Sequence, residues 1–233
     1  MTIEHDFYTE LTQHRRAIDA IDDKLIALLN ERCEYVAQVG RLKSKYQLQG
    51  SYIRPAREAM MVRALLDKSQ GAFPRASIAA IWRIIIGSST AIESPLSTLT
   101  FADDAEGNHV AAQYFGPEVP HQSAPSEQEF FQQLEKNPHC IAIVPYVLDA
   151  SWWQLMPDPM RVFACLPFVG ARPSHLALGH IEAEPTGEDM SLFYDYETRT
   201  VFEQRGFHCV EQPLIPPQKH ALFIGAYALP CAL

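Results

Sequence analysis

The sequence predicts two parts of different fold class, an all-helical segment over residues 1–97 and a small mixed α/β segment over residues 98–233. Residues 1–98 hold 13 Lys+Arg against 11 Asp+Glu, with three prolines. Residues 99–233 hold 6 Lys+Arg against 17 Asp+Glu, with 14 prolines. Because proline breaks helix interiors, the change in its frequency favours two domains that meet between residues 97 and 98.

The first helix is predicted from a long amphipathic pattern. Residues 8–46 contain no proline and one glycine, and their apolar residues recur every three or four positions. This spacing places them on one face of a single helix. The residues of this stripe are Ile18, Ile21, Leu25, Leu28, Leu29, Val36, Val39 and Leu42.

Two shorter helices are predicted to follow. One begins at Pro55, a favoured first-turn residue, and ends before Gly71; the next begins at Pro74 or Arg75 and ends before Pro95. Three helices of these lengths leave little local core, so we expect the stripe of the first to pack against a second copy of the chain. The residues expected to face inward on the third helix are Ile78, Ile81, Trp82, Ile85 and Ile92.

Three cationic residues on the first helix point to a small anionic ligand. Arg32 and Lys43 are eleven residues apart, which is about three turns and roughly 16 Å on one face. Arg15 lies seventeen residues before Arg32, roughly 25 Å away and about 100° round the helix. It cannot reach the same small molecule from the same helix. The geometry suggests an intertwined dimer that binds a small dianion.

These residues also carry a family resemblance. Residues 15–32 read RRAIDAIDDKLIALLNER, residues 39–43 read VGRLK, the pair Arg57-Glu58 follows, and residues 84–93 read IIIGSSTAIE. In this order and spacing they resemble the all-α chorismate mutases over about residues 8–95. The resemblance implies an intertwined helical dimer that converts chorismate to prephenate for phenylalanine and tyrosine biosynthesis.

That reaction is pericyclic, so the site needs no nucleophile, metal or cofactor. The enzyme holds the dicarboxylate in a compact conformer and stabilises charge on the breaking ether oxygen. By the resemblance, Arg32 and Arg15 of the partner subunit bind carboxylates, and Lys43 contacts a carboxylate and the ether oxygen.

The resemblance also assigns residues of the second and third helices. Glu58 accepts the substrate hydroxyl, Arg57 supports the charge network, and Ser89 lies near a carboxylate. Glu93 faces the ether oxygen and is expected to be protonated, because an ionised carboxylate would repel the developing charge and donate no hydrogen bond. Arg54 departs from the family, which often has a short polar residue there.

Other residues receive plainer interpretations. The overall charge of −9 argues against nucleic acid and anionic membranes, and no signal peptide or membrane-spanning run is found, so we expect a cytoplasmic protein. The five cysteines are expected to be buried small hydrophobes, and the scattered histidines suggest no metal site. The basic residues interpreted as solvated are Arg16, Arg41, Lys45, Arg63 and Arg83.

The second half is predicted to begin with a loop over residues 95–107. Helices follow at residues 110–115 and 126–136, the latter opened by Ser126 and Glu129 in capping-box spacing. Strand-like runs are predicted at residues 140–147, 161–169, 175–183, 191–196 and 220–229.

Parts of this half resemble prephenate dehydratase, whose first lobe is similar at residues 111–116 and 141–145. Residues 184–193 and 205–207 are weakly similar to the ACT-type regulatory region. The catalytic Thr-Arg-Phe of the dehydratase falls at residues 174–176, which read Ser-His-Leu. With the arginine and threonine replaced, no dehydratase activity is expected. The degenerate half then serves either as structural packing or as a contact for an effector or protein partner.

Two alternatives to the mutase remain open. An isochorismate pyruvate-lyase would use the same helical fold, and product analysis with both substrates separates the two enzymes. A regulatory subunit that binds another shikimate-pathway enzyme would lack catalysis. Retention of the cationic residues argues against that second alternative.

Overall fold

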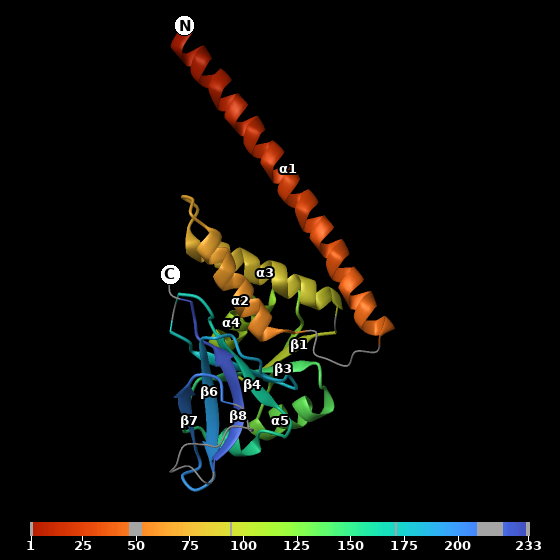
Figure 1. Cartoon of the computed structure of the whole chain (residues 1–233), viewed down its shortest axis with the longest axis vertical. Coiled ribbons are helices and arrows are strands. Elements are labelled where there is room, and N and C mark those ends of the chain that lie inside the picture. The colour runs from red at the N-terminus through yellow and green to blue at the C-terminus, as the bar shows by residue number, and fades with distance from the viewer. Residues whose placement is uncertain (1, 47–52, 94, 171, 209–220, 232–233) are drawn as a thin grey trace. The chain divides into compact units, whose positions relative to one another are not determined.

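The computed structural model describes residues 2–46, 53–93, 95–170, 172–208 and 221–231 (Figure 1). The chain divides into two compact units, residues 1–49 and residues 50–233. Their positions relative to one another are not determined, so each unit is described by itself. The predicted boundary between residues 97 and 98 stays a prediction.

The first unit is one helix, α1, which spans Thr2–Lys45 without interruption. The predicted long helix is therefore confirmed, with six more residues at its start. The apolar stripe of α1 is largely exposed in the single chain, where Ile21, Leu25 and Leu28 are 54%, 53% and 60% exposed. A contiguous exposed apolar stripe of this length is typical of an interaction surface.

The second unit begins with the two shorter helices, α2 (Pro55–Lys68) and α3 (Arg75–Glu93), both close to their predicted bounds. The rest of this unit is an α/β sheet structure, so the predicted order of a helical region and then a mixed sheet region is confirmed. Its further helices are α4 (Ala105–Phe115), α5 (Glu127–Lys136) and the 3-10 helix η1 (Ser151–Leu155).

Eight strands form one mixed sheet in the order β2-β1-β3-β5-β4-β8-β6-β7. Strand β1 pairs in parallel with β2 and β3, and β4 in parallel with β8, whereas the other neighbours are antiparallel. The strands are β1 (Ser97–Phe101), β2 (His121–Ala124), β3 (Cys140–Pro145), β4 (Arg161–Leu166), β5 (His175–Gly179), β6 (Asp189–Asp195), β7 (Thr200–Arg205) and β8 (Ala221–Ala228).

The sheet is covered on both faces, and β3 shows how. Side chains alternate along a strand, so Ile141 and Ile143 join one apolar core while Ala142 and Val144 join the other. The first core also receives side chains of α2, α3 and α4, and the second receives those of α5 and η1. Both faces of the sheet are therefore removed from water at β3, whereas the edge strands β2 and β7 have exposed positions.

Helix α3 packs against α4 through a glycine. A Cβ on Gly87 would lie 2.0 Å from the carbonyl oxygen of Phe115, so only glycine allows this approach. The face of α3 that is buried in this chain carries Ala79, Arg83, Ile86, Gly87 and Ser89. The prediction that Ile81 and Ile92 face inward is wrong for the single chain, where they are 41% and 61% exposed.

Helix α2 is tied to the C-terminal strands by two arginines. The guanidinium of Arg63 donates to the Leu229 carbonyl (2.8 Å) and to the Thr186 hydroxyl (3.0 Å). Arg54, at the N-cap of α2, forms an ion pair with Glu184 at 2.8 Å. The solvated interpretation of Arg63 is therefore wrong, and residues 184–188 act here as an anchor for α2.

The predicted helices and strands of the second half are mostly confirmed, and the strands are shorter than the predicted runs except for β6. Ser126 caps α5 by accepting from the Glu129 backbone N–H, as the capping-box spacing indicates. The prediction of a loop over residues 95–107 is wrong, because this range contains β1 and the start of α4. The sequence patterns also did not predict β2 and β7. Cys140 and Cys165 are buried as expected, whereas Cys33 and Cys231 are only half-buried, which corrects the expectation for these two. Cys209 lies outside the described residues.

Of the described helices, α3 has the length and apolar composition of a membrane-spanning helix. A core helix of a soluble protein meets the same criteria, and part of α3 is buried against α4. The finding is weak evidence and assigns no span.

Candidate active site

Helix α1 carries Arg15, Arg32 and Lys43 on continuous helical backbone, so the axial separations deduced from their numbers hold. Arg32 follows Leu28 by four residues and precedes Tyr35 by three, which places it in line with the exposed apolar stripe. A second chain that covers this stripe would also cover the Arg32 position. Arg15 is exposed in the single chain.

Helices α2 and α3 carry the other four predicted residues. Arg57 is exposed, whereas its neighbour Glu58 is buried against α3. Ser89 is buried and its hydroxyl donates to the Ile85 carbonyl at 2.6 Å, and Glu93, one turn further on, is half-buried. Because the two units are described separately, the grouping of these residues with those of α1 stays a prediction.

The structure pairs Glu58 with a residue that sequence reasoning missed. Arg83 Nη1 donates to Glu58 Oε2 at 3.2 Å, and the two side chains are 5% and 11% exposed. The solvated interpretation of Arg83 is therefore wrong. Burial raises the pKa of the Glu58 carboxyl, while the positive charge of Arg83 and the backbone N–H of Arg54 oppose that rise.

Two aromatic rings hold the Arg83 guanidinium. Its central carbon lies 4.2 Å from the centre of the Tyr114 ring and 4.6 Å from that of Phe168. Such cation–π contacts favour a cation in a place with little water. The one sequence signal for Arg83 was its helical spacing, because it lies four residues from Ala79 and from Gly87 on the face that packs against α4.

A second polar network occupies the position that resembles the dehydratase motif. The buried His175 ring lies 3.1 Å from Asp104 through Nε2 and 2.9 Å from the Ser174 hydroxyl through Nδ1. Asp104 is also the N-cap of α4, accepting from the Gly107 backbone N–H. The network joins the start of β5 to the start of α4. Among the described residues, no three His, Cys, Asp or Glu side chains gather as a metal site would require.

Comparison with known proteins gives the family that the helical segment resembles. Residues 14–94 match the model of the chorismate mutase type II family. This range covers α2, α3 and the part of α1 from His14 to its end, and it confirms the resemblance read from the motifs.

Individual relatives extend the similarity beyond this segment. The chain is 30% identical over 136 residues to a bifunctional chorismate mutase/prephenate dehydratase of Neisseria gonorrhoeae, covering 58% of this chain and 36% of the relative. Proteins of the same description from Pseudomonas aeruginosa and Aquifex aeolicus are 26% and 28% identical, covering 58% of this chain and 38% of each relative.

The matched part thus spans little more than a third of the length of these relatives. The aligned stretches are longer than the family match, so they include residues outside 14–94. No solved structure matches the chain significantly.

Proposed function

We propose that the chain is a chorismate mutase that acts as a homodimer, with each site built from both subunits. The observation that carries the proposal is α1, an uninterrupted helix with Arg15, Arg32 and Lys43 at the family positions and an exposed apolar stripe. The match of residues 14–94 to the type II family supports the reaction class.

The proposed chemistry is electrostatic. Arg32 of one subunit and Arg15 of the partner subunit bind the two carboxylates and hold chorismate in its compact conformer. Lys43 donates to the ether oxygen as the carbon–oxygen bond breaks, and protonated Glu93 donates to the same oxygen. Arg57 and Ser89 support the charge network around the carboxylates.

Glu58 has a double assignment in this proposal. The family position makes it the acceptor for the substrate hydroxyl, and in the single chain its carboxylate pairs with Arg83. A carboxylate has two oxygens and about four acceptor sites, so one oxygen can keep Arg83 while the other accepts the hydroxyl. Arg83 would then position Glu58.

We further propose a cytoplasmic enzyme without dehydratase activity, although the relatives are described as bifunctional. The position that resembles the catalytic Thr-Arg-Phe holds Ser174, His175 and Leu176, and the His175 ring is engaged with Asp104. A buried imidazole in that contact offers no guanidinium to position a substrate carboxylate. Prephenate should therefore accumulate and phenylpyruvate should form only at the spontaneous rate.

The test is product analysis with purified protein. Chorismate should be consumed with equimolar formation of prephenate, and Lys43→Ala should lower kcat/KM by about a thousandfold or more. Lys45→Ala, on the same turn, is the matched control and should stay near wild type. Conversion of isochorismate to salicylate and pyruvate at a higher rate would favour the lyase instead. Enzyme-dependent phenylpyruvate would overturn the expected absence of dehydratase activity.

A further inference from the structure

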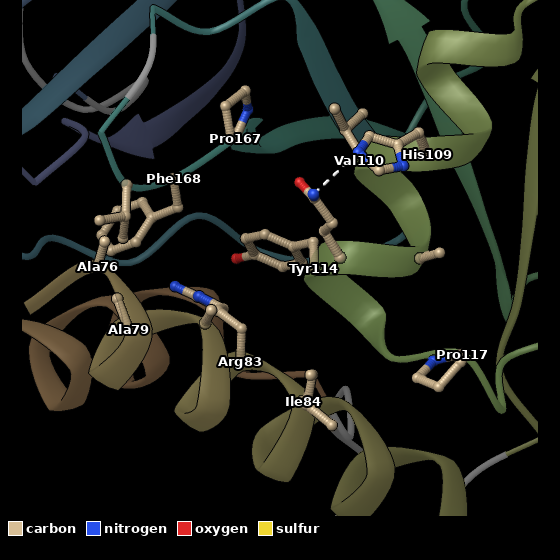
Figure 2. Close-up of a pocket in the computed structure, with 14 residues that line it drawn as sticks. Ala76, Ala79, Arg83, Ile84, His109, Val110, Tyr114, Pro117, Pro167 and Phe168 are labelled. Atoms are coloured by element: carbon tan, nitrogen blue, oxygen red, sulfur yellow. Dashed lines mark hydrogen bonds between the residues drawn. The ribbon is translucent and has the colours of Figure 1, made fainter. Parts of the chain in front are cut away.

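The Glu58 carboxylate is held at both of its oxygens. The backbone N–H of Arg54 donates to Oε1 at 3.4 Å, and Arg83 Nη1 donates to Oε2 at 3.2 Å. Figure 2 shows the Arg83 side chain extending from α3 toward the rings of Tyr114 and Phe168, whose centres lie 4.2 Å and 4.6 Å from its guanidinium carbon. The direction of the carboxylate therefore depends on one side chain of α3 and on the backbone at the start of α2.

Arg54 is fixed in turn by Glu184, which lies in the segment before β6. The Nη2 and Nε atoms of Arg54 donate to Oε1 and Oε2 of Glu184 at 2.8 Å and 3.3 Å. Two parallel N–H···O bonds fix the relative direction of the two groups as well as their distance. Because the Arg54 side chain is engaged with Glu184, what this residue supplies to Glu58 is its backbone N–H.

The segment that carries Glu184 is a turn held by its own hydrogen bonds. One carboxylate oxygen of the buried Asp189 accepts from the backbone N–H groups of Thr186 and Gly187 at 2.9 Å and 3.1 Å. The other oxygen accepts from the Thr186 hydroxyl at 2.6 Å. Gly187 has a φ of 90°, which glycine adopts without strain. We name residues 184–189 the anchor turn.

The anchor turn also contacts α2 through Arg63. The Arg63 guanidinium donates to the Thr186 hydroxyl at 3.0 Å and to the Glu188 carbonyl at 3.1 Å. Arg54 precedes Glu58 along the chain and Arg63 follows it, so the turn holds α2 on both sides of Glu58. The position of Glu58 is therefore set by the sheet part of the chain as well as by its own helix.

We propose that Arg54 and Glu184 are positioning residues of the mutase site, which act by placing the carboxylate of Glu58. The proposal rests on the proposed function, in which Glu58 accepts the substrate hydroxyl. This hydroxyl takes no part in the bonds that break and form, so its contact with Glu58 stabilises the bound substrate and the transition state alike. A misplaced Glu58 should therefore raise KM and leave kcat nearly unchanged. Partial unfolding would instead lower kcat at an unchanged KM, so kinetics separate a positioning role from a structural one.

Charge reversal of this pair in the full chain tests the proposal. The two side chains are 51% and 41% exposed, and exposed pairs contribute little to stability, so the variants should fold. Glu184→Arg should raise KM for chorismate about three- to fivefold. Arg54→Glu combined with Glu184→Arg restores a pair of opposite charges and should return KM to within about twofold of wild type. Glu182→Arg makes the same charge change at another exposed position of this segment and should keep the wild-type KM.

Deoxychorismate, the analogue without the hydroxyl, shows whether the effect passes through Glu58. Wild type and Glu184→Arg should have the same KM for this analogue, because the contact with Glu58 is absent in both. If wild type is active and Glu184→Arg keeps its KM for chorismate, this proposal alone is overturned. A fall in kcat at an unchanged KM, or an equal rise in KM for both substrates, would overturn it in the same way. A wild type without mutase activity would overturn the proposed function as well.

Discussion

Helices α1 and α3 both lie in the segment that matches the chorismate mutase family, but their side chains meet different surroundings. The apolar stripe of α1 is exposed in the single chain, and α1 forms a compact unit of its own. Helix α3 packs through Gly87 onto α4 of the sheet part. Two helices of the matched segment thus bury their apolar faces differently. Helix α3 packs against the chain's own sheet region, whereas α1, as we propose, packs against a second copy of the chain.

The largest expected effect comes from placing a charge in the stripe of α1. Leu25→Glu should convert a dimer to a monomer and lower mutase kcat/KM by more than about a hundredfold, since a carboxylate would be buried between two chains. Light scattering and the chorismate assay measure the two effects. Ala27→Glu, on the opposite face of α1, is the matched control and should leave both unchanged. If Leu25→Glu is still dimeric and active, the stripe of α1 is not buried between two chains, and the proposed role of α1 is contradicted.

The α3 side is tested through its glycine. Gly87→Ala places a Cβ 2.0 Å from the Phe115 carbonyl oxygen, so the free energy of unfolding should fall by about 3 kcal/mol. Gly71→Ala is the control, because a Cβ at Gly71 meets nothing within 4 Å and should change stability by less than about 1 kcal/mol. Urea unfolding measures both. Equal stability of the two variants would mean that α3 does not rest on α4 in solution.

The proposed role of Glu93, near the end of α3, would connect this helix to the chemistry. If a protonated Glu93 donates to the ether oxygen, wild-type activity should rise as the pH falls from about 8 toward about 5. Glu93→Gln donates at any pH, so its profile should be flatter and it should keep activity at pH 8. Superimposable pH profiles would show that Glu93 does not face the ether oxygen.

The smallest effect concerns the buried pair between α2 and α3. Because burial raises the pKa of Glu58, the folded chain binds this proton more tightly than the unfolded chain does. The resulting stability is fully present below the unfolded value, about 4.5, and is lost as the pH rises through the higher folded pKa. The unfolding free energy of wild type minus that of Glu58→Gln should therefore decrease as the pH rises from 4.5. An increase of this difference with pH would mean that the charge of Arg83 lowers the pKa of Glu58 by more than burial raises it.

Much of the helical part could be predicted because its signals are local. The stripe of α1 and the proline that opens α2 are both visible over a few turns of sequence. Strand β1 was missed because its polar residues resemble a loop, whereas the structure satisfies them internally: the Thr98 hydroxyl lies 3.0 Å from His121, and the Thr100 hydroxyl donates to Asn108. Those partners come from β2 and α4, further along the chain.

The difference between local and distant contacts also explains which site residues could be predicted. Arg15, Arg32 and Lys43 could be proposed from their spacing on one helix together with the family resemblance. Arg83 was misjudged because an isolated arginine in a helix is usually solvated. Its burial depends on Tyr114, Phe168 and Glu58, which come from three other segments. No local sequence pattern indicates that these residues come into contact.

The central claim is that two copies of α1 complete each mutase site, and subunit mixing tests it most directly. Arg15→Ala and Arg32→Ala chains should each be nearly inactive alone. After exchange, half of the dimers should be mixed, and each mixed dimer holds one site with both defects and one with neither. The account predicts recovery of about a quarter of wild-type activity. No recovery, with mixed dimers demonstrated by native mass spectrometry, would contradict it.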